Sequence, residues 1–280
     1  MTSLECDLAV KQVSYEKIIS SFGKPIPFLL HSLRFSSIFH DRSSIRFDIS
    51  SSVGTVITRF RHGPDMSIHS VPTAIPYDSN VYLLKGERNV LIDTATGIDS
   101  GRMISNIRAL LGSRDLDMVI LTHCHGDHIG GLRDVMREFG SEAFALPPDS
   151  EHIRNNDDQY ILGSLLGVSH GPVEVTDLSP GQIIDIGDHR LRIIPTPGHT
   201  AGGICLYDEV THSLFSGDTL FLDGVGRTDF PSGSFQSLRQ SLMTISNIDI
   251  RGLYPGHGNC SEQYGSDYVR KGLRLVGDLS

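Results

Sequence analysis

Short apolar runs alternate with helix-like patterns along most of the chain beyond residue 50. Runs of this length that are rich in valine, isoleucine, leucine and phenylalanine are typical of buried strands. Because these runs outnumber the predicted helices and several are close enough to form hairpins, we expect two sheets with helices outside them. A single doubly wound sheet is disfavoured. The predicted strands cover 53–60, 80–85, 89–94, 117–122, 142–147, 182–187, 191–196, 203–207 and 213–218.

Three segments, 104–111, 129–139 and 235–245, have the 3.6-residue period of an amphipathic helix. Gly112 and Gly140 predict where the first two end, since glycine is favoured just past a helix C-terminus. A fourth helix is predicted over 149–167, either as a cap over a pocket or as ordinary packing. Its apolar side would consist of Tyr160, Ile161, Leu165 and Leu166. The predicted N-cap of the helix over 235–245 is Ser232 or Ser234.

Residues 1–50 differ from the rest of the chain. An apolar helix face is predicted between Val10 and Phe22, and glycine, prolines and a serine-rich stretch follow it. We predict that 1–50 is an N-terminal extension that packs on the main domain or on a partner subunit, as in a homo-oligomer. Residues 51–280 would then form the main domain.

Composition and charge narrow the class of protein and its partners. The 280 residues are 39% hydrophobic and 20% charged, as in a globular protein. A formal net charge of −9 predicts no binding to nucleic acid or to anionic membranes. A group of arginines between Arg34 and Arg61 is diluted by acidic residues and is interpreted as a solvated face.

Cysteine usage bears on where the protein works. The four cysteines are widely spaced and form no CxxC pair, which indicates free thiols in a reducing compartment. The N-terminus has no basic start followed by an apolar run, and no apolar stretch is long enough to span a bilayer. We therefore expect a cytoplasmic protein.

The stretch "LTHCHGDHIGGL" over 121–132 places three histidines and an aspartate within six positions. A predicted buried strand precedes it, so His123 and His125 can leave the strand end on one side. Cys124 would point the other way and is interpreted as a buried, inert thiol. Neutral imidazole and carboxylate groups suit zinc and related ions. The candidate metal ligands here are His123, His125, Asp127 and His128.

Three more candidate ligands follow apolar runs and lie beside glycines: His199 in "TPGHTAGG", Asp218 in "FSGDTLF" and His257 in "YPGHGN". Taken alone, each is better interpreted as an ordinary loop residue. A catalytic ion needs about three protein ligands and one open position. Combined with the first cluster, these residues could therefore complete two metal sites.

The series "THCHGDHIGG", "TPGHTAGG", "SGDTLF" and "PGHG" resembles, in this order, the motifs of the metallo-β-lactamase superfamily. The resemblance covers about 75–257. It implies an α/β fold of that superfamily, a four-layer αββα sandwich with two metal ions at one edge of the sheets. The implied cofactors are two divalent ions, zinc first, with iron or manganese as alternatives.

The resemblance also implies a role for each candidate ligand. The first metal would be held by His123, His125 and His199. The second would be held by Asp127, His128 and His257. Asp218 would bridge the two metals. Asp93, in "LIDTATG", matches an aspartate that supports the ligands, although Ala95 intervenes where the family usually has glycine.

The stretch "GVGRTDFPSGS" over 224–234 resembles the glyoxalase II-like branch, which includes hydroxyacylglutathione hydrolases. This resemblance implies an enzyme, a thioesterase acting on a small-molecule acyl thioester. A hydroxide bridging the metals would attack the thioester carbonyl, and Asp127 would orient that hydroxide.

The carrier of the acyl group is left open by the same stretch. Arg227 and Asp229 stand where longer members have a lysine and a tyrosine that help bind glutathione. The 23 residues after His257 leave no room for the additional helical domain of those members. Arg227 either binds a substrate carboxylate through its forked donors or forms a structural salt bridge with Asp229.

Three alternatives to a thioesterase stay open. The first is a mononuclear iron persulfide dioxygenase that uses His123, His199 and Asp218 as a two-histidine, one-carboxylate triad. A single iron and oxygen uptake would identify it. The second is another hydrolase of the superfamily, such as a lactonase, a β-lactamase or a nuclease. The third is a non-catalytic protein, which would purify without metal.

Overall fold

The computed structural model describes residues 46–52, 55–61, 67–73, 75–168 and 171–277. Contacts within the chain divide it into two units, 1–62 and 63–280. In the first unit, β1 (Arg46–Ser52) and β2 (Thr55–Arg61) form an antiparallel hairpin. Strand β2 was predicted and β1 was not. The apolar helix face predicted near the N-terminus lies outside the described residues, and the division at residue 50 stays a prediction.

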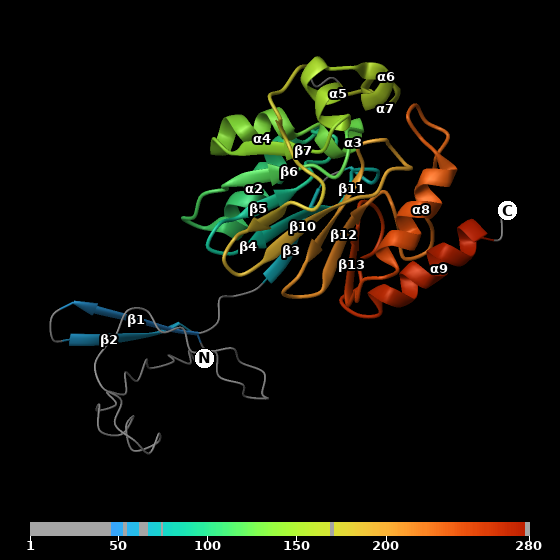
Figure 1. Ribbon diagram of the computed structural model, residues 1–280. Coiled ribbons are helices and arrows are strands. Elements are labelled where there is room, and N and C mark those ends of the chain that lie inside the picture. Colours follow the sequence, from blue (N-terminus) through green and yellow to red (C-terminus); the bar gives the residue numbers. More distant parts are fainter. Residues whose placement is uncertain (1–45, 53–54, 62–66, 74, 169–170, 278–280) are drawn as a thin grey trace, which may run out of the picture. The chain divides into compact units, whose positions relative to one another are not determined.

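The second unit contains two sheets that lie face to face (Figure 1). In the first sheet β3, β4 and β5 pair antiparallel, and the strands from β5 to β8 are parallel. Its strands, in spatial order, are β3 (Ser67–Val71), β4 (Val81–Lys85), β5 (Val90–Ile92), β6 (Met118–Ile120), β7 (Glu142–Ala145) and β8 (Thr176–Asp177).

The second sheet is antiparallel except for the parallel pair β12 and β13. Its strands, in spatial order, are β13 (Gly252–Pro255), β12 (Ser213–Gly217), β11 (Ile204–Asp208), β10 (Arg190–Pro195) and β9 (Ile183–Asp185). All nine strands predicted from apolar runs are present, with ends that differ by a few residues.

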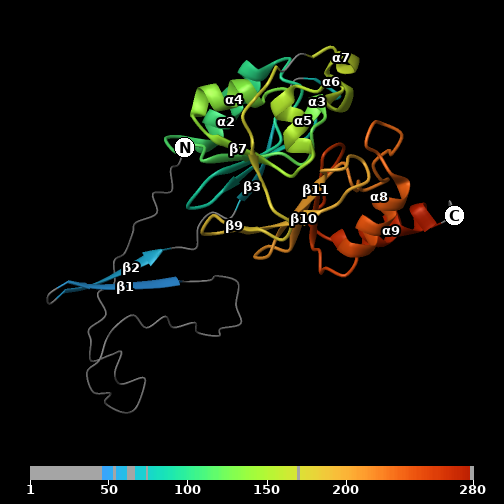
Figure 2. The same cartoon turned by 45° about the horizontal axis from the view of Figure 1, so that its top comes forward.

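Helices cover the outer faces of both sheets (Figure 2). The first sheet is covered by α2 (Ser100–Leu111) and α4 (Leu132–Phe139), and the second by α8 (Phe235–Ile245) and α9 (Gly265–Gly277). The Ser234 side chain accepts a hydrogen bond from the backbone N–H of Ser237, so Ser234 is the N-cap of α8. The four layers confirm the predicted αββα sandwich. None of the helices in the described part of the chain has the length and apolarity to cross a membrane.

Three apolar cores separate the four layers. They form because successive side chains of each strand point to opposite faces of its sheet. In β4, Val81 and Leu83 face the helices, whereas Tyr82 and Leu84 face the other sheet. In the second sheet, Leu206 points into the core between the sheets while its neighbours contact α8 and α9. Because both faces of both sheets are buried, the strands are almost continuously apolar, as their sequence predicted.

Two helix predictions need correction. The helix predicted over 129–139 is split into α3 (Gly126–Ile129) and α4, because a Cβ on Gly130 would lie only 2.0 Å from the carbonyl oxygen of Thr96. The helix predicted over 149–167 is wrong as a single element. Left-handed backbone at Asn156 (φ 51°) and Leu162 (φ 61°) divides it into three short helices. They are α5 (Asp149–Asn155), α6 (Asp158–Ile161) and α7 (Gly163–Leu166).

A buried carboxylate joins the start of β10 to the end of β11. Asp208 accepts hydrogen bonds from His189 Nδ1 and Thr211 Oγ1, both at 2.6 Å. The backbone N–H groups of Arg190 and Val210 donate to its other oxygen. Burial alone would raise the pKa of Asp208, but its hydrogen bonds with His189 and Thr211 outweigh burial and lower that pKa.

Replacing Asp208 with alanine is expected to lower the free energy of unfolding by about 2–4 kcal/mol, because the buried donors lose their acceptor. Since the folded-state pKa is lowered, the carboxylate contributes its full stability above about pH 4 and loses it as the pH falls through that pKa. Urea unfolding of both proteins at pH 7 and pH 3 measures the difference. A difference that stays constant between these pH values would contradict the assignment.

Candidate metal centre

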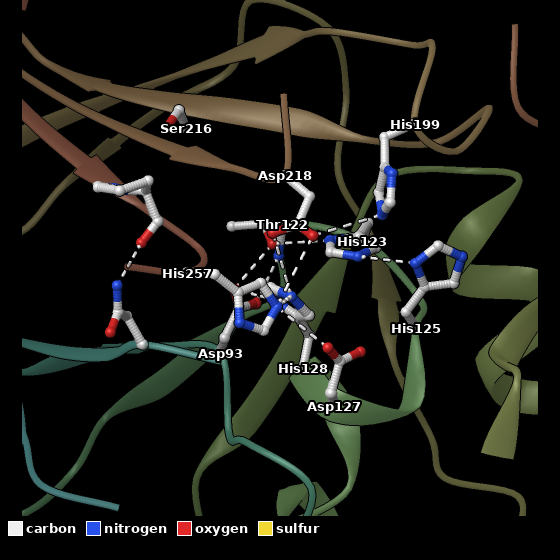
Figure 3. Close-up of polar contacts among 12 residues, drawn as sticks. Asp93, Thr122, His123, His125, Asp127, His128, His199, Ser216, Asp218 and His257 are labelled. Atoms are coloured by element: carbon white, nitrogen blue, oxygen red, sulfur yellow. Dashed lines mark hydrogen bonds and ion pairs between the residues drawn. The ribbon is translucent and has the colours of Figure 1, made fainter. Parts of the chain in front are cut away.

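The candidate ligands gather at one edge of the sandwich because they follow the carboxyl ends of strands (Figure 3). His123 and His125 follow β6, and His199 follows β10 after a short turn. Asp218 comes directly after β12, and His257 comes two residues after β13. Since β12 and β13 are parallel, their carboxyl ends lie together. The remaining two candidates, Asp127 and His128, lie in α3.

All seven predicted ligands lie in one cluster, and their donor atoms form three overlapping groups. Within each group the donor atoms are within 4.8 Å of one another. The groups are His123, His125 and His199; His123, His128 and Asp218; and Asp127, His128 and His257. The first and third coincide with the two ligand sets implied by the resemblance.

Asp218 lies between the two predicted metal sets. Its Oδ1 is 3.3 Å from His128 Nε2, and its Oδ2 is 3.5 Å from His199 Nε2 and 3.7 Å from His257 Nε2. Asp218 therefore reaches donors of both sets. Gly256 makes this approach feasible, because a Cβ there would lie 2.2 Å from Asp218 Oδ1.

The donor set fits divalent cations. His123 Nε2 lies 3.1 Å from His125 Nδ1, and His128 Nε2 lies 3.3 Å from His257 Nε2. Two nitrogen lone pairs this close repel each other unless a proton or a metal ion lies between them. In addition, His199 Nε2 and Asp218 Oδ1 are buried without a hydrogen-bond partner among the described residues. Unpaired buried polar atoms that converge in this way indicate an ion-binding site.

Asp93 orients two of the histidines through their Nδ1 atoms, one directly and one through Thr122. It accepts hydrogen bonds from His128 Nδ1, from Thr122 Oγ1 and from the Thr122 backbone N–H, all at 2.8 Å. Thr122 Oγ1 in turn lies 3.1 Å from His123 Nδ1. Because each Nδ1 has an acceptor, the Nε2 of both rings is left as the metal-facing nitrogen. Asp93 has a φ of 59°, and Ala95, at the position where the family usually has glycine, has a φ of 56°, the left-handed region that glycine adopts freely.

The loop over 224–234 orients a third histidine. His199 Nδ1 lies 2.8 Å from the carbonyl oxygen of Arg227. A carbonyl accepts only, so His199 donates from Nδ1 and its Nε2 keeps a lone pair toward the cluster. The backbone of this stretch, which resembles the glyoxalase II-like branch in sequence, therefore orients a candidate ligand.

Burial and neighbouring charges set the protonation of the cluster. Burial and the other imidazoles hold the pKa of His123 well below its ordinary value, and burial with His199 lowers the pKa of His125 to about 3. Burial would raise the pKa of Asp218, but His128 outweighs it and the pKa is lowered. Burial would lower the pKa of His128, but Asp218 and Asp93 raise it well above the ordinary value. An ion bound there would displace the His128 proton.

A residue that sequence analysis missed connects the ligand loops. Asp149 is fully buried at the start of α5. Its Oδ2 accepts from the Cys124 backbone N–H at 2.9 Å, and its Oδ1 accepts from the Gly202 N–H at 2.7 Å. Cys124 separates two candidate ligands of the first sheet, and Gly202 lies three residues after His199 of the second. Asp149 thus fixes both loops, but nothing in "LPPDSEH" indicates this role.

Arg227 forms the structural salt bridge that was one of its two predicted roles. Its Nε and Nη2 donate to the two carboxylate oxygens of Asp229 at 2.7 and 2.6 Å. Its guanidinium carbon also lies 4.0 Å from the ring centroid of Phe230. A role in binding a substrate carboxylate stays a prediction.

Comparison with known proteins agrees with this geometry. The family model described as the metallo-beta-lactamase superfamily matches residues 74–257. A probable metallo-hydrolase of Methanocaldococcus jannaschii is 34% identical over 199 residues, which cover 69% of this chain and 94% of that protein. The hydroxyacylglutathione hydrolase GloC of Haemophilus influenzae is 29% identical over 206 residues, covering 69% of this chain and 92% of that protein.

Solved structures share the same architecture. The di-iron-bound form of the protein TTHA1623 matches with a TM-score of 0.61 and 26% identity, covering 70% of this chain and 95% of that one. The B3 metallo-beta-lactamase BLEG-1 matches with a TM-score of 0.62 and 25% identity, covering 72% of this chain and 96% of that one.

Proposed function

This chain belongs to the metallo-β-lactamase superfamily and is a metallo-hydrolase of that fold, and from this premise we propose that it hydrolyses thioesters. The observation that carries the proposal is the pair of donor groups with Asp218 between them, beside a cavity. Two ions bound there, zinc in our proposal, would supply Lewis acidity and a water of lowered pKa. The similarity to a hydroxyacylglutathione hydrolase supports the choice of thioesters.

Water is the proposed nucleophile because the site offers no side chain for that role. The cavity beside the cluster is about 390 Å³, and none of its described lining residues is a serine, cysteine or lysine. Burial raises the pKa of Cys124 well above its ordinary value and that of Cys205 to about 11, so neither thiol is activated. We propose that the Asp127 carboxylate, which lines the cavity, orients the attacking water.

The leaving group also favours a thioester. An amine or an alkoxide departs poorly unless it is protonated, whereas a thiol, with a pKa near 8.5, departs as the thiolate. Outside the candidate ligands, none of the described lining residues is an acid that could protonate a leaving group. The net charge of −9 further supports a small-molecule substrate rather than nucleic acid, and we propose cytoplasmic action on it.

Hydrolysis of S-lactoylglutathione and of S-acetyl-N-acetylcysteamine by zinc-loaded protein tests the proposal. We expect turnover of at least one of the two thioesters and two zinc ions per chain by elemental analysis. His123→Ala is expected to lose on the order of 10³-fold in kcat/KM or more, because it removes a ligand of the first metal. His212→Ala is the matched control, since His212 is a half-exposed histidine outside the cluster.

Two results would contradict a thioesterase. Protein that binds two zinc ions but cleaves neither thioester, while it opens a lactone or a β-lactam ring, would be another hydrolase of the superfamily. Protein that purifies with one iron and consumes oxygen with a persulfide substrate would be a dioxygenase.

A further inference from the structure

The cavity beside the metal centre has a polar floor and apolar walls. Its volume of about 390 Å³ lies within the range of small-molecule sites. The floor consists of four candidate ligands: His125, Asp127, His199 and Asp218. The walls are apolar except for Arg227, and they consist of Leu162, Leu165, Leu166, Phe221, Val225 and Phe230.

Two leucines that line the cavity occupy positions that other residue types would suit better. Leu162 has a left-handed backbone (φ 61°), which a leucine side chain disfavours and which glycine would adopt freely. Leu165, in α7, leaves 69% of its surface exposed, although a polar residue would suit that position. Both side chains line the cavity, where an apolar ligand would cover them.

The loop over 224–234 adds aromatic surface to the cavity, and its cation is already paired. The centroids of the Phe230 and His125 rings lie 5.6 Å apart, so the apolar lining directly adjoins the candidate ligands. Arg227, the one cationic lining residue among those described, donates from Nε and Nη2 to Asp229 and covers Phe230. A substrate carboxylate would therefore have to share this guanidinium with Asp229, whereas an uncharged hydrocarbon chain needs no cation.

We propose that this cavity binds an apolar acyl chain, so that the preferred substrates are medium-chain aliphatic acyl thioesters rather than short hydroxyacyl thioesters. The inference rests on the proposed function, and it names the substrate class of the same site. Each methylene that the walls remove from water is expected to improve binding about fourfold. If three of the six methylenes that distinguish octanoyl from acetyl are buried, the octanoyl thioester gains about 60-fold in kcat/KM.

The catalytic test varies the acyl chain on one neutral thiol. Acetyl, butanoyl, hexanoyl and octanoyl thioesters of N-acetylcysteamine are compared with zinc-loaded protein. We expect kcat/KM to rise with chain length until the walls are covered. In Leu165→Asn the ratio of kcat/KM for the octanoyl thioester to kcat/KM for the acetyl thioester is expected to fall about tenfold, which is the size of effect expected when one apolar contact in a pocket is lost. Leu275→Asn is the matched control, because this leucine is also partly exposed but lies on α9, outside the cavity.

A binding test separates this inference from the proposed function. S-butyl, S-hexyl and S-octyl thioethers of N-acetylcysteamine have no thioester carbonyl, so their dissociation constants can be measured by calorimetry whether or not the protein is a thioesterase. We expect the dissociation constant to fall with chain length in wild-type protein and in Leu275→Asn, and to change less in Leu165→Asn. Dissociation constants that are independent of chain length would overturn the apolar acyl site. Tight octyl binding without thioester turnover would instead overturn only the proposed reaction.

Discussion

Replacing Asp218 with alanine is expected to reduce kcat/KM by on the order of 10³-fold or more and to lower the number of bound ions from two to one or none. The reason is its position between the two donor sets, within 3.3–3.7 Å of three histidine nitrogens. Loss of a group that merely supports a ligand typically lowers metal affinity or activity about 10–100-fold, and loss of a shared ligand should lower them more. Elemental analysis and thioester kinetics measure both effects.

Asp223→Ala is the matched control for this substitution. Asp223 follows the same strand but points to solvent, where it pairs with Lys271. We expect it to retain two ions and wild-type kinetics, since an exposed ion pair contributes little. An Asp218→Ala protein that keeps both ions and its activity would show that Asp218 is not a shared ligand.

Replacing Asp149 is expected to weaken metal binding by the first metal set, although Asp149 touches no metal-facing atom. In Asp149→Asn the new amide can accept one of the two backbone N–H groups but presents a donor to the other. Each buried N–H left without an acceptor costs about 1–3 kcal/mol, so unfolding should become easier by at least about 1 kcal/mol. The loops that carry His123, His125 and His199 would lose their connection, and we expect metal affinity there to fall 10–100-fold.

Competition with a chelator measures the affinity, and urea unfolding of the metal-free protein measures the stability. Asp177→Asn serves as the control, because Asp177 also contacts α5, through Ser150 and Arg154, but touches neither ligand loop. If Asp149→Asn binds two ions as tightly as wild-type protein, then Asp149 has a purely structural role in α5.

The sequence predicted the layers and the cluster because both depend on local patterns. Apolar runs locate buried strands, and a strand end followed by glycine and histidine locates a donor at a sheet edge. Asp149 could not be found this way, since its partners Cys124 and Gly202 are 25 and 53 residues away. The breaks at Asn156 and Leu162 were equally hidden, because neither residue type demands a left-handed backbone.

The order of the two sheets along the chain determines when an ion can be captured. Residues 67–177 build the first sheet and carry four of the predicted donors, and residues 183–255 build the second. Each predicted ligand set needs at least one histidine from the later half, His199 or His257. During synthesis the earlier donors therefore emerge from the ribosome without the partners that complete either set. Neither ligand set can therefore be completed until the two sheets have docked.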